Sequence, residues 1–137
     1  MRFSSYHPEG VLGEFVDFFW MITDGAADRR ERIFPSGTSE LVVNLSEDEV
    51  RIYDSVRSER YKRLSGAVFS GTYSCPFICD AKQHQSMIGV HFRPGGASPF
   101  LGTAASALAD AHVNPRCRWA SLRNSSAGFS DSSKWWA

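Results

Sequence analysis

Two segments of this chain alternate apolar with polar or small side chains at the period of an extended strand. They are residues 39–46 (SELVVNLS) and residues 85–93 (QSMIGVHFR). A period of two is that of a β-strand, whose successive side chains point to opposite faces. We therefore predict two strands whose apolar faces pack together as the core, because a buried face fixes the register strongly. The residues of these two faces are Leu41, Val43, Leu45, Ile88, Val90 and Phe92.

The rest of the first 114 residues divides into further short elements. A helical turn running into a strand is predicted in residues 11–22, and residues 54–63 are predicted to form an exposed loop. Two short helices are expected after the Pro94-Gly95-Gly96 stop, with Gly102 ending the first of them. Residues 50–53 are predicted to return after the acidic turn at 47–49 and to pair with the preceding strand. The other strand candidates are residues 30–35, 67–70 and 76–80.

This order of elements, many short strands and then small helices, indicates one mainly β domain. We predict a β-barrel or jelly roll with two short C-terminal helices, extending over residues 1–114. Residues 115–137 are rich in Ser and have no apolar period, although they contain Trp119, Trp135 and Trp136. We expect this tail to be poorly ordered.

Charge and cysteine content limit the functions that fit. Fifteen Lys and Arg balance fifteen Asp and Glu, so the chain has no basic field of the kind that binds nucleic acid. The three cysteines are an odd number without a secretory leader, which fits a reducing compartment. The most apolar stretch, residues 15–22, is short and contains Asp17, so it does not span a bilayer. We expect a soluble, cytoplasmic protein that binds neither nucleic acid nor membrane.

Two blocks of sequence resemble a known family. They are RIFPSGTSELVVNLS (32–46) and IGVHFRPGGASPFLG (88–102), preceded by Phe19-Trp20. With these blocks the chain is similar, over residues 6–114, to the N-terminal cupin-like domain of bacterial AraC/XylS-type transcriptional regulators. The resemblance implies a cupin-like β domain that senses a small-molecule effector and often dimerises.

In that family a C-terminal pair of helix-turn-helix units binds DNA, and the sequence ends at Ala137 before any such pattern. DNA binding is therefore not carried over to this chain. The resemblance implies partnership with a second copy or with a full-length regulator. A truncated or frame-shifted regulator, a natural short product and a non-functional gene fragment all remain open explanations of the tail.

The face opposite the predicted core supplies candidate ligand-binding residues. Small-molecule sites are mostly apolar, with a few placed polar groups. An alternative is that Glu40 and Arg93 form an exposed ion pair, that His91 is solvated and that Trp20 belongs to the core. The candidates on this face are Glu40, Asn44, His91 and Arg93, and Trp20 and Phe34 are the candidates for aromatic walls.

An enzyme is the second hypothesis. A small metal-dependent cupin would need His84, His91 and a carboxylate, with Glu40 and Asp80 as the available acids. The chain has no His-x-His pair and no Gly-x-Ser-x-Gly nucleophile motif. Cys75 and Cys79 without a second pair are a weak zinc signal. We therefore predict a protein without catalytic residues, metal or cofactor.

Overall fold

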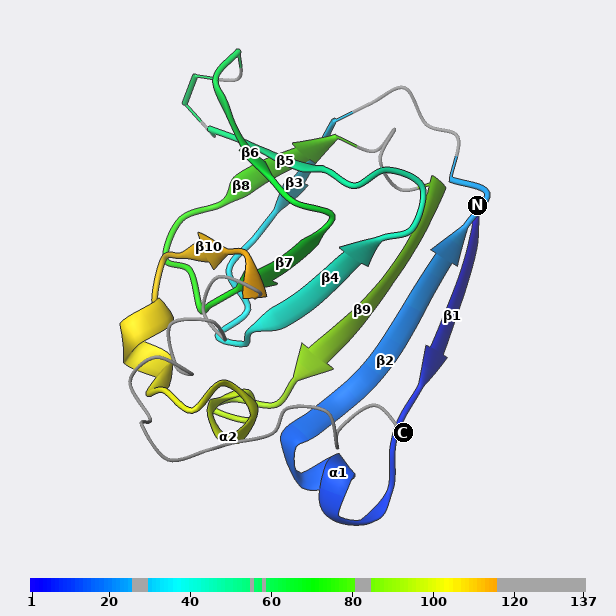
Figure 1. Ribbon diagram of the computed structural model, residues 1–137, viewed down its shortest axis with the longest axis vertical. Coiled ribbons are helices and arrows are strands. Elements are labelled where there is room, and N and C mark those ends of the chain that lie inside the picture. The colour runs from blue at the N-terminus through cyan, green and yellow to red at the C-terminus, as the bar shows by residue number, and fades with distance from the viewer. Residues whose placement is uncertain (26–29, 55, 58, 81–84, 116–137) are drawn as a thin grey trace, which may run out of the picture.

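The chain folds into two antiparallel β-sheets that face one another. The computed structural model describes residues 1–25, 30–54, 56–57, 59–80 and 85–115. Within them ten strands divide into a six-stranded and a four-stranded sheet, with only short helices (Figure 1). The fold is mainly β and jelly-roll-like, as the sequence predicts.

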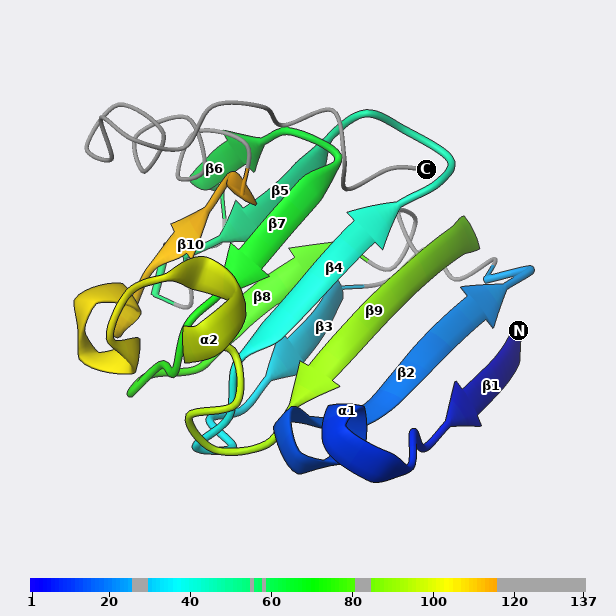
Figure 2. The same ribbon diagram turned by 60° about the horizontal axis from the view of Figure 1, so that its bottom comes forward.

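The six-stranded sheet has the order β1-β2-β9-β4-β7-β10 (Figure 2). Its central strands are the two predicted from alternation, and β9 pairs with β2 on one side and with β4 on the other. Its strands are β1 (Arg2–Tyr6), β2 (Val16–Thr23), β4 (Glu40–Asn44), β7 (Ala67–Ser70), β9 (Ser86–Phe92) and β10 (His112–Val113).

The four-stranded sheet has the order β3-β8-β5-β6. Its strands are β3 (Arg30–Ile33), β5 (Val50–Tyr53), β6 (Tyr61–Leu64) and β8 (Phe77–Asp80). Two predictions are corrected here. β5 does not return alongside β4; it crosses to the second sheet and pairs with β6 and β8. The segment 54–63 is predicted to be a loop, but its last residues begin β6. This polar segment becomes an edge strand because its backbone pairs with β5.

The predicted pairing of the two apolar strand faces is confirmed, and their predicted burial is confirmed in part: Phe92 belongs to the main buried cluster, and Leu41 and Val90 pack against it. The other end of this face is not covered by any described residue, and the face as a whole does not point into the space between the sheets. Leu41 pairs with Val90, and Val43 with Ile88. Val42, on the other face of β4, lines the space between the sheets. Ile88 is 39% exposed and Leu45 is 52% exposed. The alternation identifies which residues share a face, and here the apolar face lies outside the pair of sheets.

One end of this outer face is covered by the C-terminal helices α2 (Ser98–Leu101) and η2 (Ala105–Leu108). Leu101 and Leu108 pack there in one buried cluster with strand residues. Gly102 adopts the left-handed conformation, φ 62°, that ends α2, as predicted. The whole cluster comprises Val16, Phe69, Phe92, Ala97, Leu101 and Leu108.

The N-terminal segment contains the predicted helical turn followed by a strand. Helix α1 (Gly10–Phe15) leads directly into β2, which has a bulge between Val16 and Phe18. β1 and β10 are absent from the sequence-based prediction, because RFSSY does not alternate and β10 has only two residues. No helix within the described residues is long and apolar enough to cross a membrane. The tail that is predicted to be poorly ordered, residues 115–137, lies outside the described residues except for Pro115.

Candidate functional site

A cavity of about 350 Å³ lies between the two sheets. That volume is within the range of small-molecule sites. Its wall comes from both sheets, so the strand faces turned toward one another build it. The lining residues are Met1, Phe3, Phe18, Trp20, Ile22, Glu31, Ile33, Glu40, Val42, Val50, Ile52, Val68, Ser70, Phe77, Cys79 and Met87.

The wall is apolar and aromatic, with few polar side chains. The polar side chains are the carboxylates of Glu31 and Glu40, the Ser70 hydroxyl and the Cys79 thiol. Among the described lining residues there is no Lys, Arg or His. Both ionisable carboxyl groups on this part of the wall are thus acidic side chains, one from each sheet.

Glu40 is held in place by Trp20 across the intervening strand β9. Trp20 lies opposite Gly89 in the β2–β9 pair, and its Nε1 donates a 2.5 Å hydrogen bond to Glu40 Oε1. A Cβ at position 89 would meet the Trp20 ring at 2.2 Å. Gly89 therefore leaves the space through which the indole reaches the carboxylate.

His91 forms the other side of this polar cluster. Its Nδ1 is 3.7 Å from Glu40 Oε1, and its Nε2 shares a 3.2 Å hydrogen bond with the Thr38 hydroxyl. Phe18 stacks on the imidazole, with the ring centroids 4.7 Å apart. The interaction with Glu40 raises the pKa of His91, and the charge of Asp17 adds to this, whereas burial acts in the opposite direction.

The structure thus places three of the six candidate residues together at the cavity. Trp20 and Glu40 line it, and His91 contacts Glu40. The alternative in which Glu40 pairs with an exposed Arg93 is wrong, because the partner of Glu40 is His91. The other three candidates lie elsewhere.

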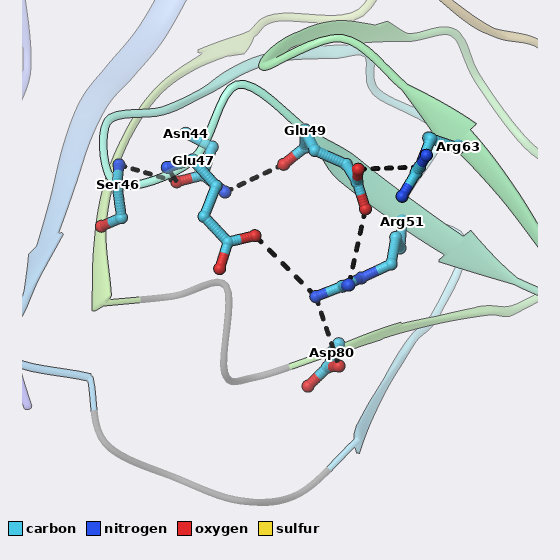
Figure 3. Close-up of polar contacts among 7 residues, drawn as sticks. All are labelled: Asn44, Ser46, Glu47, Glu49, Arg51, Arg63 and Asp80. Atoms are coloured by element: carbon cyan, nitrogen blue, oxygen red, sulfur yellow. Dashed lines mark hydrogen bonds and ion pairs between the residues drawn. The ribbon is translucent and has the colours of Figure 1, made fainter.

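Asn44 is buried, and its side chain is used in the turn that follows β4 (Figure 3). Its Oδ1 accepts hydrogen bonds from the backbone N–H groups of Ser46 and Glu47, at 2.9 and 3.2 Å. Its Nδ2 donates to the Glu49 carbonyl at 3.0 Å. Asn44 therefore closes the turn and does not line the cavity.

The same region holds a cluster of charges around Arg51 (Figure 3). The Arg51 guanidinium lies 3.4 Å from Glu49 and 3.9 Å from both Glu47 and Asp80. Arg63 adds a 2.7 Å contact to Glu49. Asp80, one of the two acids considered for a metal site, is thus an ion-pair partner of Arg51.

Phe34 and Arg93 lie away from the cavity. Phe34 is 65% exposed, and its carbonyl accepts a hydrogen bond from the Tyr73 hydroxyl at 2.9 Å. Arg93, just beyond the end of β9, donates to the Gly13 carbonyl at 2.7 Å and pairs with Asp17 at 3.8 Å. It ties β9 to the helical turn and to β2.

Several cavity residues are absent from the ligand-binding candidates predicted from the sequence. Cys79 is one; burial, with the nearby charge of Glu31, raises the pKa of its thiol to about 12. Ser70 is another, and its hydroxyl shares a 2.8 Å hydrogen bond with His112 Nδ1. Burial and the charge of Lys62 lower the pKa of His112. Alternation within residues 67–70 and 76–80 could have placed Ser70 and Cys79 on an inner face.

The structure also bears on the metal hypothesis. Within the described part of the chain no three His, Cys, Asp or Glu side chains lie together in a way that could hold a metal ion. His84, one of the proposed ligands, lies outside the described residues. Cys75 is exposed and Cys79 is partly buried, and both side chains are thiols rather than halves of a disulfide.

A second hollow, of about 480 Å³, lies on the outer face of the six-stranded sheet. It is the uncovered part of the apolar face described above. None of its described lining residues is acidic. Its apolar lining residues include Tyr6, Phe19, Met21, Leu41, Val43, Ile88 and Val90.

Comparison with protein families matches residues 4–114 to a family described as a domain of unknown function, DUF6597. No curated protein and no solved structure gives a significant match.

Proposed function

The chain belongs to the DUF6597 family of domains of unknown function, and from the cavity between its two sheets we propose that it is a ligand-sensing domain. The observation that carries the proposal is the cavity between the sheets, which combines apolar walls with one oriented carboxylate. A site of this kind binds a small molecule by burying its apolar body and fixing one polar group.

The proposal extends to the role that the resemblance to AraC/XylS-type regulators implies. The domain would act in the cytoplasm as the sensor and dimerisation part of a transcriptional regulator, with a small-molecule effector. A ligand that binds one arrangement of the domain better than another shifts the population toward it. The dimer, with a second copy or with a full-length regulator, is supported by the resemblance alone, and sedimentation velocity tests it.

Binding without catalysis fits the polar groups of the cavity better than an enzyme does. The Cys79 thiol, with its pKa raised to about 12, is protonated at neutral pH and is a poor nucleophile. The Glu40 carboxylate already interacts with Trp20 and His91. We therefore propose a role in which these groups orient a ligand and leave it unchanged.

The experiment uses aminoanthracene, a neutral apolar probe whose fluorescence rises in apolar surroundings. The test variant is Val42→Phe, which fills the cavity, and the matched control is Val43→Phe, one residue along the same strand in the outer hollow. We expect the probe to bind the wild type and the control, and to bind the cavity variant at least about tenfold more weakly, because a phenyl ring occupies the same space. Equal loss in both variants, or no saturable binding to the wild type, would overturn the proposal.

A further inference from the structure

We propose that the ligand of this cavity is a hydrophobic cation, an ammonium group on an aromatic or alkyl body, and that the Glu40 carboxylate is its anchor. This inference rests on the proposed function, since it names the class of ligand for the same cavity. Three features of the cavity support it: its charged groups, its aromatic rings and the orientation of Glu40.

The charged groups on the wall favour a cation. Glu31 and Glu40 line the cavity, and no described lining residue is Lys or Arg. An anionic ligand would enter this largely apolar space beside the Glu40 carboxylate, and burying a charge without a partner is costly. A cation finds in Glu40 a partner of opposite sign, and a charge-assisted hydrogen bond is stronger than a neutral one.

The aromatic lining points the same way. Phe3, Phe18, Trp20 and Phe77 all contribute to the wall. The face of an aromatic ring attracts a cation, and the attraction is larger when water is excluded. A cavity that combines a carboxylate with several aromatic side chains is therefore suited to an ammonium group.

Glu40 is also pre-oriented before any ligand arrives. Its Oε1 accepts the hydrogen bond from Trp20, which fixes the carboxylate against the wall. Burial raises the pKa of the Tyr73 hydroxyl and of the Cys79 thiol, and the charge of Glu40 adds to both shifts. A fixed carboxylate binds a cation with less loss of side-chain freedom than a mobile one does.

The proton on His91 competes with such a ligand for the same carboxylate. The groups around His91 are Glu40 on β4, Asp17 and the Phe18 ring on β2, and Thr38 before β4. Beyond them, Arg93 on β9 pairs with Asp17, and His7 packs on Phe18. When His91 is protonated it partly neutralises Glu40. Binding of a cation is therefore expected to strengthen as the pH rises through the pKa of His91, with release of a proton.

The test is a competition assay with bound aminoanthracene and three small competitors that differ mainly in charge. These are phenethylamine, phenethyl alcohol and phenylacetate. We expect the amine to displace the probe at about tenfold lower concentration than the alcohol, and phenylacetate to be the weakest. We also expect displacement by the amine to improve between about pH 6 and pH 8, where the amine itself stays protonated, while displacement by the alcohol changes little.

Glu40→Gln is the test variant, and Glu59→Gln, at an exposed position outside the cavity, is the matched control. The test variant should lose the preference for the amine and still bind aminoanthracene, whereas the control keeps both. If the probe binds but the amine displaces it no better than the alcohol, the inference is wrong and the proposed function stands. If the probe itself does not bind the wild type, the proposed function fails. The pH comparison on the wild type decides the inference even if Glu40→Gln does not fold.

Discussion

Trp20 donates its indole N–H to the Glu40 carboxylate across strand β9, over the position where Gly89 has no side chain. Three neighbouring strands therefore supply one polar arrangement: the donor from β2, the open space from β9 and the acceptor from β4. This arrangement orients the carboxylate that we propose as the ligand anchor, and it depends on position 89 having no side chain.

Gly89→Ala should destabilise the protein by about 1–3 kcal/mol, because the new methyl group would overlap the Trp20 ring and force it to move. In a Trp20→Leu background the same substitution should cost at least about 1 kcal/mol less, since the overlapping ring is gone. Urea unfolding of the four proteins of this double-mutant cycle measures the coupling. Equal costs in both backgrounds would show that Gly89 does not serve the indole.

The His91–Glu40 pair should stabilise the protein at low pH. The pKa of His91 is raised in the folded state above its ordinary value of 6.5, so its contribution is fully present below that value and is lost as the pH rises through the folded pKa. Relative to the wild type, His91→Gln should therefore be most destabilised below about pH 6.5 and progressively less above it. Unfolding measured across this range checks the trend; a difference that grows with pH would contradict it.

His112 should behave in the opposite way and gives an internal contrast. Burial lowers its pKa in the folded state, so its contribution is present above the ordinary value of 6.5 and is lost as the pH falls. In the His112→Gln variant, the free energy of unfolding should therefore fall less at acid pH than it does in the wild type. If the pH profile of the unfolding free energy is the same for His112→Gln and the wild type, the lowered pKa is refuted.

The cysteines should differ sharply in reactivity. Cys75 is exposed, whereas Cys79 is partly buried, lines the cavity and has its thiol pKa raised to about 12. Because the thiolate is the reactive form, iodoacetamide at neutral pH should alkylate Cys75 at least about tenfold faster than Cys79. Peptide mapping by mass spectrometry follows each site, and addition of urea should remove the difference. Comparable rates in the folded protein would mean that Cys79 is accessible.

Helices α2 and η2, which cover one end of the outer face, should contribute strongly to stability. Leu108→Ala in helix η2 should cost about 2–5 kcal/mol, because Leu108 is buried in the cluster with Phe69 and Phe92. Leu45→Ala, at a position that is 52% exposed, should change stability by less than about 0.5 kcal/mol. Thermal unfolding of both variants tests this. A small effect at Leu108 would mean that η2 does not cover the sheet.

Alternation in the sequence correctly predicts β4 and β9 and the pairing of their apolar faces. It does not tell which face is inside. Leu41 and Val43 belong to the more apolar face of β4, yet it is Glu40 and Val42 that face the second sheet. These two residues line the cavity between the sheets. The inner side depends on how β5 and β8 fold over the first sheet, which local periodicity does not encode.

The candidate site is only partly predictable for the same reason. Trp20, Glu40 and His91 come together because β2, β9 and β4 are neighbouring strands. Gly89 also has no side chain that would block the Trp20 ring. Asn44 lies on the same inner face of β4, but its side-chain amide is hydrogen-bonded to the backbone of the turn that follows the strand. Cys79 enters the cavity from the other sheet, and the long-range pairing of β8 determines its place.

The most direct measurement is the set of intermolecular nuclear Overhauser effects between bound phenethylamine and methyl groups of the labelled protein. The account predicts contacts to Val42, Ile52 and Val68, which line the cavity between the sheets. It predicts none to Val43 or Ile88, which line the outer hollow. Contacts confined to Val43 and Ile88 would place the ligand on the outer face and contradict the account.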